Sequence, residues 1–358
     1  MGCLEQDLKR VKANFVNIHG FLPEKSCLSA VSKALSLVSK TPPTRHLRWA
    51  LVKVDLDKAF DCIRHEAIIR NLMEMGIQHA LTLAVKQYVG NRKYVFEGLK
   101  ETWAWTRSRG VPQGGILSPL LFIIGTMHLT RQAYEYCHTI SYADDILLFI
   151  SGDNANICER IALALQAIID KAEAAGLTIN PSKTSIIIRS GTGDVLTHPT
   201  MDSLIDNITQ KFTYLGFRLN AGSTPDSLLT SHWAYLIHKL KNFELSALCA
   251  KRQLKWLKHH EVKMVWQSYA LSLVEYCLPL LTLASPAQRD KIECRLITAL
   301  KAVYGMSRHA SRHLMLLFSL GMTLNDYIVI RTIRLAILSS HIDDLTTLIS
   351  NSIYASVN

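Results

Sequence analysis

The sequence lacks the marks of a zinc site and of a secreted protein. Its eight cysteines lie far apart, with no C-x-x-C pair and no Cys/His spacing typical of zinc ligands. The N-terminal segment Met1-Gly-Cys-Leu-Glu-Gln-Asp is polar and acidic, whereas a secretory signal has a basic start and an apolar stretch. Scattered cysteines are typical of a reducing compartment. We therefore expect an intracellular protein of the cytoplasm or nucleus, without zinc, that is not secreted.

Long apolar runs, internal repeats and low-complexity tracts are also missing. Runs such as Ile146–Ile150 and Leu278–Leu283 are much shorter than the roughly 18 to 20 residues that span a bilayer. The lack of repeats disfavours a solenoid. Hydrophobic residues make up 49% of the chain and charged residues 19%, a balance typical of a globular protein. We expect a compact fold and no membrane partner.

Acidic residues are outnumbered by basic ones. The chain has 40 Lys and Arg residues against 29 Asp and Glu residues, which gives a net charge of +11. An excess of positive charge favours a polyanionic partner such as nucleic acid. On composition alone, a ribosomal protein, a membrane-surface protein and a plain basic enzyme remain open.

The pattern of apolar residues changes near residue 222. Before it, short β-type runs alternate with helical segments, and after it almost everything reads as helix. The expected strands are Trp49–Leu56, Tyr94–Glu97, Thr102–Thr106, Thr139–Ile150 (a hairpin), Thr184–Ser190 and Phe212–Leu219. Helices are expected from about His65 to Met75 and from about Asp153 to Ala175. Such alternation predicts an α+β domain with helices on one face of a sheet.

The region after residue 222 is expected to hold helices at roughly 226–249, 259–283, 286–304 and 324–342. It carries many basic residues interleaved with tryptophans: Lys239, Lys241, Lys251, Arg252, Lys255, Lys258 and Lys263, with Trp233, Trp256 and Trp266. Taken alone, this pattern is typical of a solvated basic helix face with aromatic core anchors. Contact with nucleic acid is the alternative interpretation.

Three aspartates lie where a carboxylate is costly. Asp55 ends the apolar strand Val52-Lys-Val-Asp, and Asp144 and Asp145 lie side by side between two apolar runs. Asp tolerates the dihedral angles of tight turns, which is one explanation for this pair. Two adjacent carboxylates also repel each other, and a divalent cation such as Mg²⁺ would neutralise them. The spacing therefore indicates a metal site without excluding a simple turn.

A glycine-rich segment lies between the two acidic segments. Gly110, Gly114 and Gly115 permit close backbone approach, and Gln113 can hydrogen-bond to a base or a sugar. Ser118-Pro119 is typical of a helix start, with a cap followed by proline. A loop of this kind suits the seating of a nucleotide.

Five segments, taken in order, resemble motifs of the reverse transcriptase family. They are Asp55–Asp61, Gly110–Gly114, Tyr142–Asp145, Ala175–Thr184 and Tyr214–Gly216. The first four resemble the palm motifs and the last resembles the primer grip. Because five motifs occur in the family's order and cover most of the chain, the resemblance is specific.

A further segment narrows the type of enzyme. Gly20–Ser26 is similar to the Gly-Phe-Arg-Pro-Gly-x-Ser element of non-LTR retrotransposon and group II intron enzymes, with departures at Leu22 and Glu24. The Ala-Phe-Asp form of the first motif and the long helical tail favour a LINE-like non-LTR element. The Gly-Gly-Ile-Leu-Ser-Pro form of the second motif is equally similar to group II intron maturases, the second choice.

The resemblance implies an RNA-directed DNA polymerase that transfers a nucleotide from a dNTP to a primer 3′-hydroxyl. Its implied partners are an RNA template, a DNA or RNA primer and dNTPs. Asp55 and Asp144 would bind two Mg²⁺ ions, for which Mn²⁺ is a possible substitute, and Asp145 would support them. Lys183 would protonate the leaving pyrophosphate, although a plain surface lysine remains open.

The resemblance also assigns nucleotide and primer contacts. Phe60 would lie against the sugar 2′ position and exclude ribonucleotides, with a core aromatic as the alternative. Gln113 and Gly114 would line the nascent base pair, whereas Asp61 is expected only to cap the following turn. The predicted primer contacts are Tyr142, Tyr214, Leu215 and Gly216. The basic residues and tryptophans of the helical tail would grip the template–primer duplex through its phosphates.

The implied fold is the α+β palm of a right-hand polymerase, an antiparallel sheet backed by helices, with partial fingers and an all-helical thumb. The predicted domains are a fingers remnant at 1–48, a palm at 49–222 and a helical thumb with a C-terminal extension at 223–358. The palm would include a fingers insertion at about 62–108 and the primer grip. Few residues precede Gly20, so we expect an N-terminally truncated enzyme that lacks the triphosphate contacts of complete fingers.

Two other functions remain open. One is a catalytically weakened or silent RNA-binding remnant of a mobile element. The other is an RNA-dependent RNA polymerase, which shares the palm but more often carries Gly-Asp-Asp and does not need Phe60.

Overall fold

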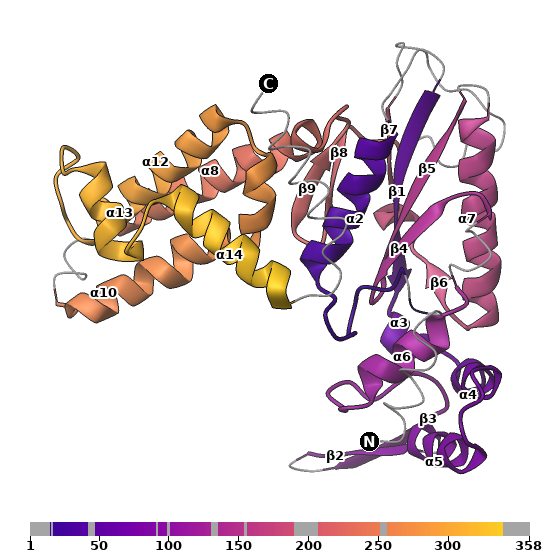
Figure 1. Cartoon of the computed structure of the whole chain (residues 1–358). Helices are drawn as coiled ribbons and strands as arrows, with labels where there is room; N and C mark the ends of the chain where they lie inside the picture. Colours follow the sequence, from indigo (N-terminus) through magenta and orange to yellow (C-terminus); the bar gives the residue numbers. More distant parts are fainter. Residues whose placement is uncertain are drawn as a thin grey trace. The chain divides into compact units, whose positions relative to one another are not determined.

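Figure 1 shows the computed structural model of the chain, coloured along the sequence. The structure describes residues 15, 17–41, 47–90, 92–98, 101–129, 135–153, 156–189, 207–250 and 256–338. These residues group into two compact units. The first contains residues up to Ala30 and from Thr41 to Gln210, and the second contains Val31–Lys40 and the residues from Lys211 onward.

A five-stranded antiparallel sheet lies at the centre of the first unit, with β1 (Leu47–Asp57) in its middle. On one side β1 pairs with β5 (Asp145–Asp153), which in turn pairs with β4 (His138–Tyr142). On its other side β1 pairs with β7 (Ser185–Arg189) and with the short strand β6 (Thr178–Ile179). Every expected strand of this sheet is thus present within one or a few residues of its predicted bounds.

The two faces of β1 have different environments, because successive side chains of a strand point to opposite faces. Val52 and Val54 belong to the main hydrophobic core of the unit, together with residues of α7 (Ile157–Ala174). This helix packs along the sheet, as Figure 1 shows. The alternate residues Lys53 and Asp55 therefore lie on the opposite face of the sheet.

The helices of the first unit are partly those that the apolar spacing predicts. The predicted helices are α4 (His65–Glu74), which ends before Gly76, and α7, which ends before Gly176. The others are α2 (Cys27–Lys40), whose later residues group with the second unit, α3 (Ala59–Cys62), α5 (His79–Val89) and α6 (Ser118–Thr126). Helix α4 packs on both α5 and α6.

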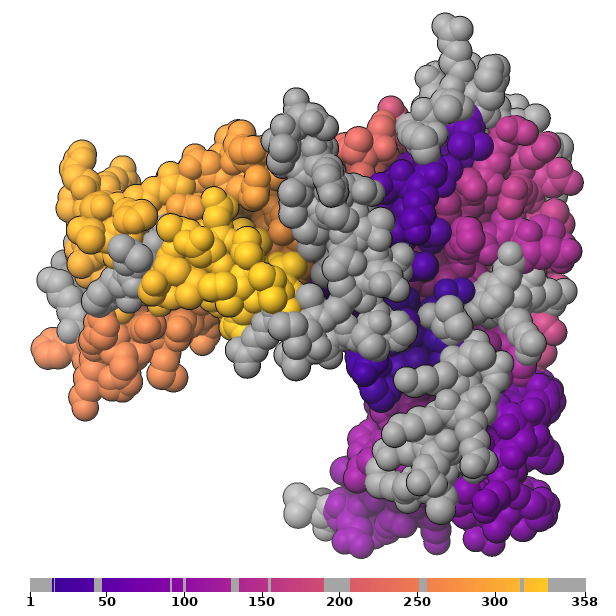
Figure 2. Space-filling model, viewed as in Figure 1, coloured from indigo at the N-terminus to yellow at the C-terminus, as the bar shows by residue number. Residues whose placement is uncertain are grey.

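A separate two-stranded hairpin consists of β2 (Arg92–Glu97) and β3 (Thr102–Arg107). Both strands match their predictions closely. In Figure 1 the hairpin lies beside α5 at the lower end of the first unit, and the space-filling view in Figure 2 shows the surface formed there. Every residue of β3 is exposed, so the hairpin contributes little to the core.

The second unit begins with a hairpin of β8 (Lys211–Tyr214) and β9 (Phe217–Asn220), which packs against α8 (Pro225–Cys249). Thr224 and Ser227 form a capping box at the start of α8, with Pro225 in the first turn. The remaining α-helices are α10 (His259–Trp266), α11 (Ser272–Tyr276), α12 (Pro286–Val303), α13 (Arg312–Leu320) and α14 (Leu324–Leu338). Among the described residues, no helix is both long and apolar enough to cross a bilayer.

One helix expectation for this unit is wrong. The helix expected at 259–283 is interrupted by a π-helical turn at Gln267–Leu271 and gives way to a 3₁₀ segment at Leu278–Leu283. Pro279 explains the second break, because proline lacks the N–H donor that a continuing α-helix needs. The second unit comprises Val31–Lys40 and the residues from Lys211 onward, and the predicted fingers, palm and thumb boundaries stay predictions.

Candidate active site

Three predicted carboxylates lie at one end of the β1–β5 strand pair. Asp55 and Asp145 are direct partners in the antiparallel register, so their side chains share one face of the sheet. Asp144 is exposed in the two-residue turn that joins β4 to β5. The sheet thus brings together acidic residues from two distant segments of the sequence.

Two lysine ammonium groups contact these carboxylates. Lys53 Nζ lies 3.6 Å from Asp145 Oδ1, and Lys183 Nζ lies 3.2 Å from Asp55 Oδ2. Burial raises the pKa of Asp145, Lys53 opposes the rise, and the charges of Asp144 and Asp55 add to it. Negative charge is therefore concentrated here, and positive groups compensate it.

The donor set fits a hard divalent cation, because Mg²⁺ prefers a few carboxylates with water and phosphate oxygens completing its shell. Asp55 and Asp145 are partly buried and adjacent, whereas Asp144 lies on the exposed turn. Within the described part of the chain, no three His, Cys, Asp or Glu side chains converge closely enough to hold a metal by themselves.

The turn that carries Asp144 is packed against the segment Gly20–Ser26. A Cβ atom on Gly20 would come within 2.6 Å of Ala143 N, so this close approach requires glycine. A hydrogen bond with Cys27, together with burial, raises the pKa of Tyr142 to about 12. The segment that resembles a fingers element therefore lies beside the acidic turn.

The glycine-rich loop packs against α3. Gly110 has a φ of +81°, and a Cβ atom there would lie 2.6 Å from Asp61 O, so glycine is required. The Asp61 carboxylate accepts hydrogen bonds from Arg107 Nη1 at 2.5 Å and from Gln113 Nε2 at 3.2 Å. The expectation that Asp61 only caps the following turn is therefore wrong, because its side chain joins three segments.

In the rest of this loop, the prediction that Ser118 caps the following helix is wrong. Gln113 and Gly114 are exposed, as a nucleotide contact needs. Ser118 does not cap α6: it is the first helical residue, and its hydroxyl donates to the carbonyl oxygen of Pro112. The serine thus closes the loop onto itself.

Residues 1–219 match the family described as reverse transcriptase (RNA-dependent DNA polymerase). This chain belongs to the reverse transcriptase family. The Pol polyprotein of the type-1 retrotransposable element R2 of Popillia japonica is 25% identical over 247 residues, which cover 60% of this chain and 32% of that protein. The 132 kDa protein of the element SLACS of Trypanosoma brucei gambiense is 26% identical over 167 residues, 45% of this chain and 13% of that protein.

These relatives confirm the predicted non-LTR retrotransposon type at family level. The chain spans less than a third of the length of either relative. A telomerase from Candida albicans, solved with a fragment of telomeric RNA, is 12% identical and aligns with a TM-score of 0.50 over 98% of this chain and 55% of its own. That likeness shows the fold alone, and it agrees with the predicted α+β palm of a polymerase, which is confirmed.

Phe60, which was predicted to lie against the sugar, packs against two other aromatic rings. Its ring stacks on Phe122, with centroids 4.1 Å apart and planes 13° apart. Phe21 approaches the same ring edge-on, with centroids 6.1 Å apart. Phe60 is half-buried, so it is neither a fully buried core aromatic nor a fully exposed ring.

The segment that resembles the primer grip of a reverse transcriptase forms the turn of the β8–β9 hairpin. Leu215 and Gly216 have φ angles of +45° and +78°, as the central residues of a type I′ turn require. The Tyr276 hydroxyl donates to Leu215 O at 2.5 Å and so fixes the turn. The Tyr214 ring is fully buried, so only the Leu215–Gly216 part of the predicted grip lies at the surface.

A concave surface of the second unit, about 520 Å³ in volume, collects positive charge; we call it the basic concavity. Its lining residues are Lys211, Arg218, Ser231, Ala234, Tyr235, His238, Lys239 and Asn242. The Arg218 guanidinium lies 3.8 Å from the centre of the Tyr235 ring, and Lys239 Nζ lies 5.5 Å from it. No acidic residue lines the basic concavity, so its cations can meet an external anion.

The basic residues and tryptophans predicted for the thumb separate into distinct groups. Trp233 and Trp266 are buried in the core of the second unit, whereas Trp256 is 90% exposed. Lys239 lines the basic concavity, and Lys241 lies on the same helix outside its lining. Lys251, Arg252 and Lys255 lie outside the described residues.

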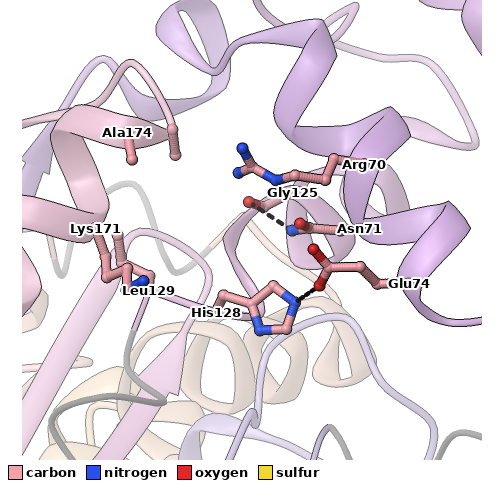
Figure 3. Close-up of a pocket in the computed structure, with 9 residues that line it drawn as sticks. Arg70, Asn71, Glu74, Gly125, His128, Leu129, Lys171 and Ala174 are labelled. Atoms are coloured by element: carbon pink, nitrogen blue, oxygen red, sulfur yellow. Dashed lines mark hydrogen bonds and ion pairs between the residues drawn. The ribbon is translucent and has the colours of Figure 1, made fainter.

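Another cavity, of about 550 Å³, lies among α4, α6 and α7 and contains none of the predicted site residues (Figure 3). His128 Nε2 lies 2.6 Å from Glu74 Oε2 at one side of it. Asn71 Nδ2 donates to Ile124 O at 2.7 Å in its wall. This cavity is therefore separate from the carboxylates.

Two features of the site were missed in the sequence. Lys53 precedes Asp55 by two residues on one strand, so the two-residue period of a strand would have placed both on one face. The ion pair between Arg107 and Asp61 joins positions 46 residues apart, and no local pattern signals it.

Proposed function

We propose that this chain is the polymerase module of a non-LTR retrotransposon-type protein. It extends a DNA or RNA primer with deoxynucleotides on an RNA template. The observation that carries the proposal is the register that pairs Asp55 with Asp145 beside the turn of Asp144, in a chain of the reverse transcriptase family. Rigid strands hold acidic oxygens at fixed positions, and preorganised charge is a major part of phosphoryl-transfer catalysis.

Asp55 and Asp144 are the proposed ligands of two Mg²⁺ ions, or of Mn²⁺ in their place, with Asp145 in support. When bound, the ions activate the primer 3′-hydroxyl and neutralise charge on the triphosphate. Lys183 Nζ is 3.2 Å from Asp55 Oδ2, at the same end of the sheet. From there it can donate its proton to the oxygen of the leaving pyrophosphate.

The nucleotide and the primer are proposed to bind at the end of the sheet that carries the three aspartates. In this proposal Gln113 and Gly114 line the nascent base pair, and the half-buried ring of Phe60 excludes a sugar that carries a 2′-hydroxyl. The Asp61 carboxylate holds Gln113 in position through a hydrogen bond of 3.2 Å. Tyr142 lies beside the Asp144 turn and is proposed to meet the primer end.

The second unit is proposed to hold the template–primer duplex. Leu215 and Gly216 offer backbone groups to the primer strand, with Tyr214 as their buried support. The basic concavity offers Lys211, Arg218 and Lys239 to backbone phosphates. Such contacts are independent of sequence and weaken as salt is raised.

Primer extension on an RNA template with deoxynucleotides and Mg²⁺ or Mn²⁺ tests the polymerase proposal. We expect labelled product from the full chain and a loss of at least about a hundredfold in Asp144→Asn, since removing one preorganised charge-stabilising group typically costs this much. Asp153→Asn, an exposed change at the other end of β5, is the matched control and should leave activity unchanged. Equal activity of Asp144→Asn and the unmodified chain would reject the assignment.

The second candidate is an RNA-binding remnant without catalysis. The observation that favours it is that Lys53 and Lys183 already neutralise Asp145 and Asp55 in ion pairs. RNA binding without any product under Mg²⁺ or Mn²⁺ would support this candidate. Product formed exclusively from ribonucleotides would instead support an RNA-dependent RNA polymerase.

Sugar selection tests the role of Phe60. In an active chain, Phe60→Ala is expected to raise the use of ribonucleotides relative to deoxynucleotides, because the ring no longer blocks the 2′-hydroxyl. The conservative change Phe60→Tyr keeps the ring and should keep the selection. Unchanged selection in a folded Phe60→Ala variant would leave Phe60 as a core aromatic that stacks on Phe122.

A further inference from the structure

The β2–β3 hairpin has one face that carries four aromatic rings and two arginines. Direct partners in the register are Arg92 with Arg107, Tyr94 with Trp105, and Phe96 with Trp103. Because side chains alternate along a strand, these six residues lie on the same face of the hairpin. We call this surface the aromatic face. The opposite face carries Lys93, Val95, Glu97, Thr102, Ala104 and Thr106.

The rings of the aromatic face are open to solvent. Phe96 is 62% exposed, Trp103 is 60% exposed and Trp105 is 48% exposed. Tyr94 and Trp105 stack with centroids 5.8 Å apart and planes 11° apart. Cross-strand ring pairs stabilise a hairpin, which accounts for the stacked pair. Stabilisation of the hairpin does not account for Phe96 and Trp103, because both rings remain mostly exposed. A contiguous exposed apolar patch marks an interaction site.

Positive charge lies at the base of the aromatic face, near the candidate active site. Arg107 lies 5.7 Å from the Tyr94 ring centre and bonds to Asp61, which also holds Gln113. Arg92 donates to Gly110 O at 3.0 Å, in the glycine-rich loop. The aromatic face is thus connected to the loop proposed to seat the nucleotide. Among the described residues of the hairpin, the acidic ones are Glu97 and Glu101, which lie near its tip.

We infer that the aromatic face binds the unpaired strand of the RNA template by stacking of bases on Phe96, Trp103 and Trp105. This inference rests on the proposed polymerase function. Flat exposed rings recognise the faces of bases, and only an unpaired strand presents those faces. The arginines at the base attract the phosphates of the same strand. A duplex would offer only its phosphates, because its bases are stacked on one another and cannot stack on the aromatic rings.

Equilibrium binding of fluorescent template–primer hybrids tests the inference without any need for catalysis. One hybrid is blunt, and the other carries an unpaired RNA template overhang on the order of ten nucleotides, within the range of known single-strand sites. The overhang should tighten binding to the unmodified chain. Trp103→Ala and Phe96→Ala should each lower the affinity for the overhang hybrid by about tenfold, since one stacked base contributes about 1 to 3 kcal/mol. Neither change should alter the affinity for the blunt hybrid.

The opposite face of the same hairpin supplies matched controls. Val95→Ala and Thr106→Ala should keep the effect of the overhang, and Trp103→Tyr should restore most of it because a ring is present again. An overhang that adds nothing in the unmodified chain, or an effect that persists in Trp103→Ala, would overturn the inference. A loss of self-association in Trp103→Ala with the overhang effect intact would also overturn it, and would identify a protein interface.

The two proposals fail differently. If the overhang effect depends on Trp103 but no primer is extended, the polymerase proposal fails and the template contact stands. If primers are extended and Trp103→Ala leaves overhang binding unchanged, only the template contact fails.

Discussion

The two compact units of this chain differ in where their charged groups lie. In the first unit, carboxylates at the end of a buried sheet are fixed by the register of β1 and β5 and are met by Lys53 and Lys183. In the second, the buried side chains of Glu244 and Lys301 are paired, Glu244 with Arg295 and Lys301 with the carbonyl oxygen of Arg308. The cations of the basic concavity have no acidic neighbour among the described residues of its lining. The first unit therefore holds carboxylates at fixed positions, and the second presents cations at its surface.

The packing of the second unit's core is tested most strongly at its tryptophans. Trp266 is fully buried, and its indole Nε1 donates to Leu296 O at 3.2 Å. Trp266→Ala should lower the free energy of unfolding by about 3 to 5 kcal/mol, the usual cost of emptying a large core position. Trp256→Ala, at a side chain that is 90% exposed, should change it by less than about 0.5 kcal/mol. Denaturant unfolding measures both, and similar values would show that Trp266 is not a core anchor.

The burial of His232 in the same core is tested by acid. Burial, aided by the positive charge of Arg218, lowers the pKa of His232 to about 4. Above pH 6.5 the ring is neutral in both folded and unfolded chains. Between about pH 6.5 and 4 only the unfolded chain takes up the proton, so stability falls with pH by up to about 3 kcal/mol.

His232→Gln, which cannot titrate in this range, should remove that part of the pH dependence. The measurement is the free energy of unfolding of both proteins between pH 7 and pH 4. Parallel curves for the two proteins would show that His232 takes up its proton equally in the folded state.

The smallest expected effect is the change in RNA binding when one cation of the basic concavity is removed. Lys239→Ala should weaken RNA binding modestly and lower the slope of log affinity against log salt by about one, as for the loss of a single phosphate contact. Lys241→Ala, on the same helix but outside the lining of the basic concavity, is the matched control and should leave the slope nearly unchanged. Equal effects of the two changes would mean that RNA affinity depends on the net charge of the chain and not on the basic concavity.

Much of the first unit could be predicted from the sequence because its signals are local. The apolar run before Asp55, the apolar runs around Asp144 and Asp145, and the helical spacing of α7 each fix an element by its own pattern. The break in the expected helix at 259–283 was also signalled locally, by Pro279, and was overlooked. The π-helical turn at Gln267–Leu271 has no comparable signal.

The sequence by itself determined the family to which this chain belongs. The order and spacing of Asp55, Gly110–Gly114 and Asp144–Asp145 are properties of the linear chain, and they suffice to recognise the family. Only the tertiary structure decided which side chains meet: Asp61 with Arg107 and Gln113, Lys53 with Asp145, and which tryptophans are buried. The reason is physical, since a strand or helix follows from neighbouring residues, whereas burial and cross-strand contacts depend on how distant segments pack.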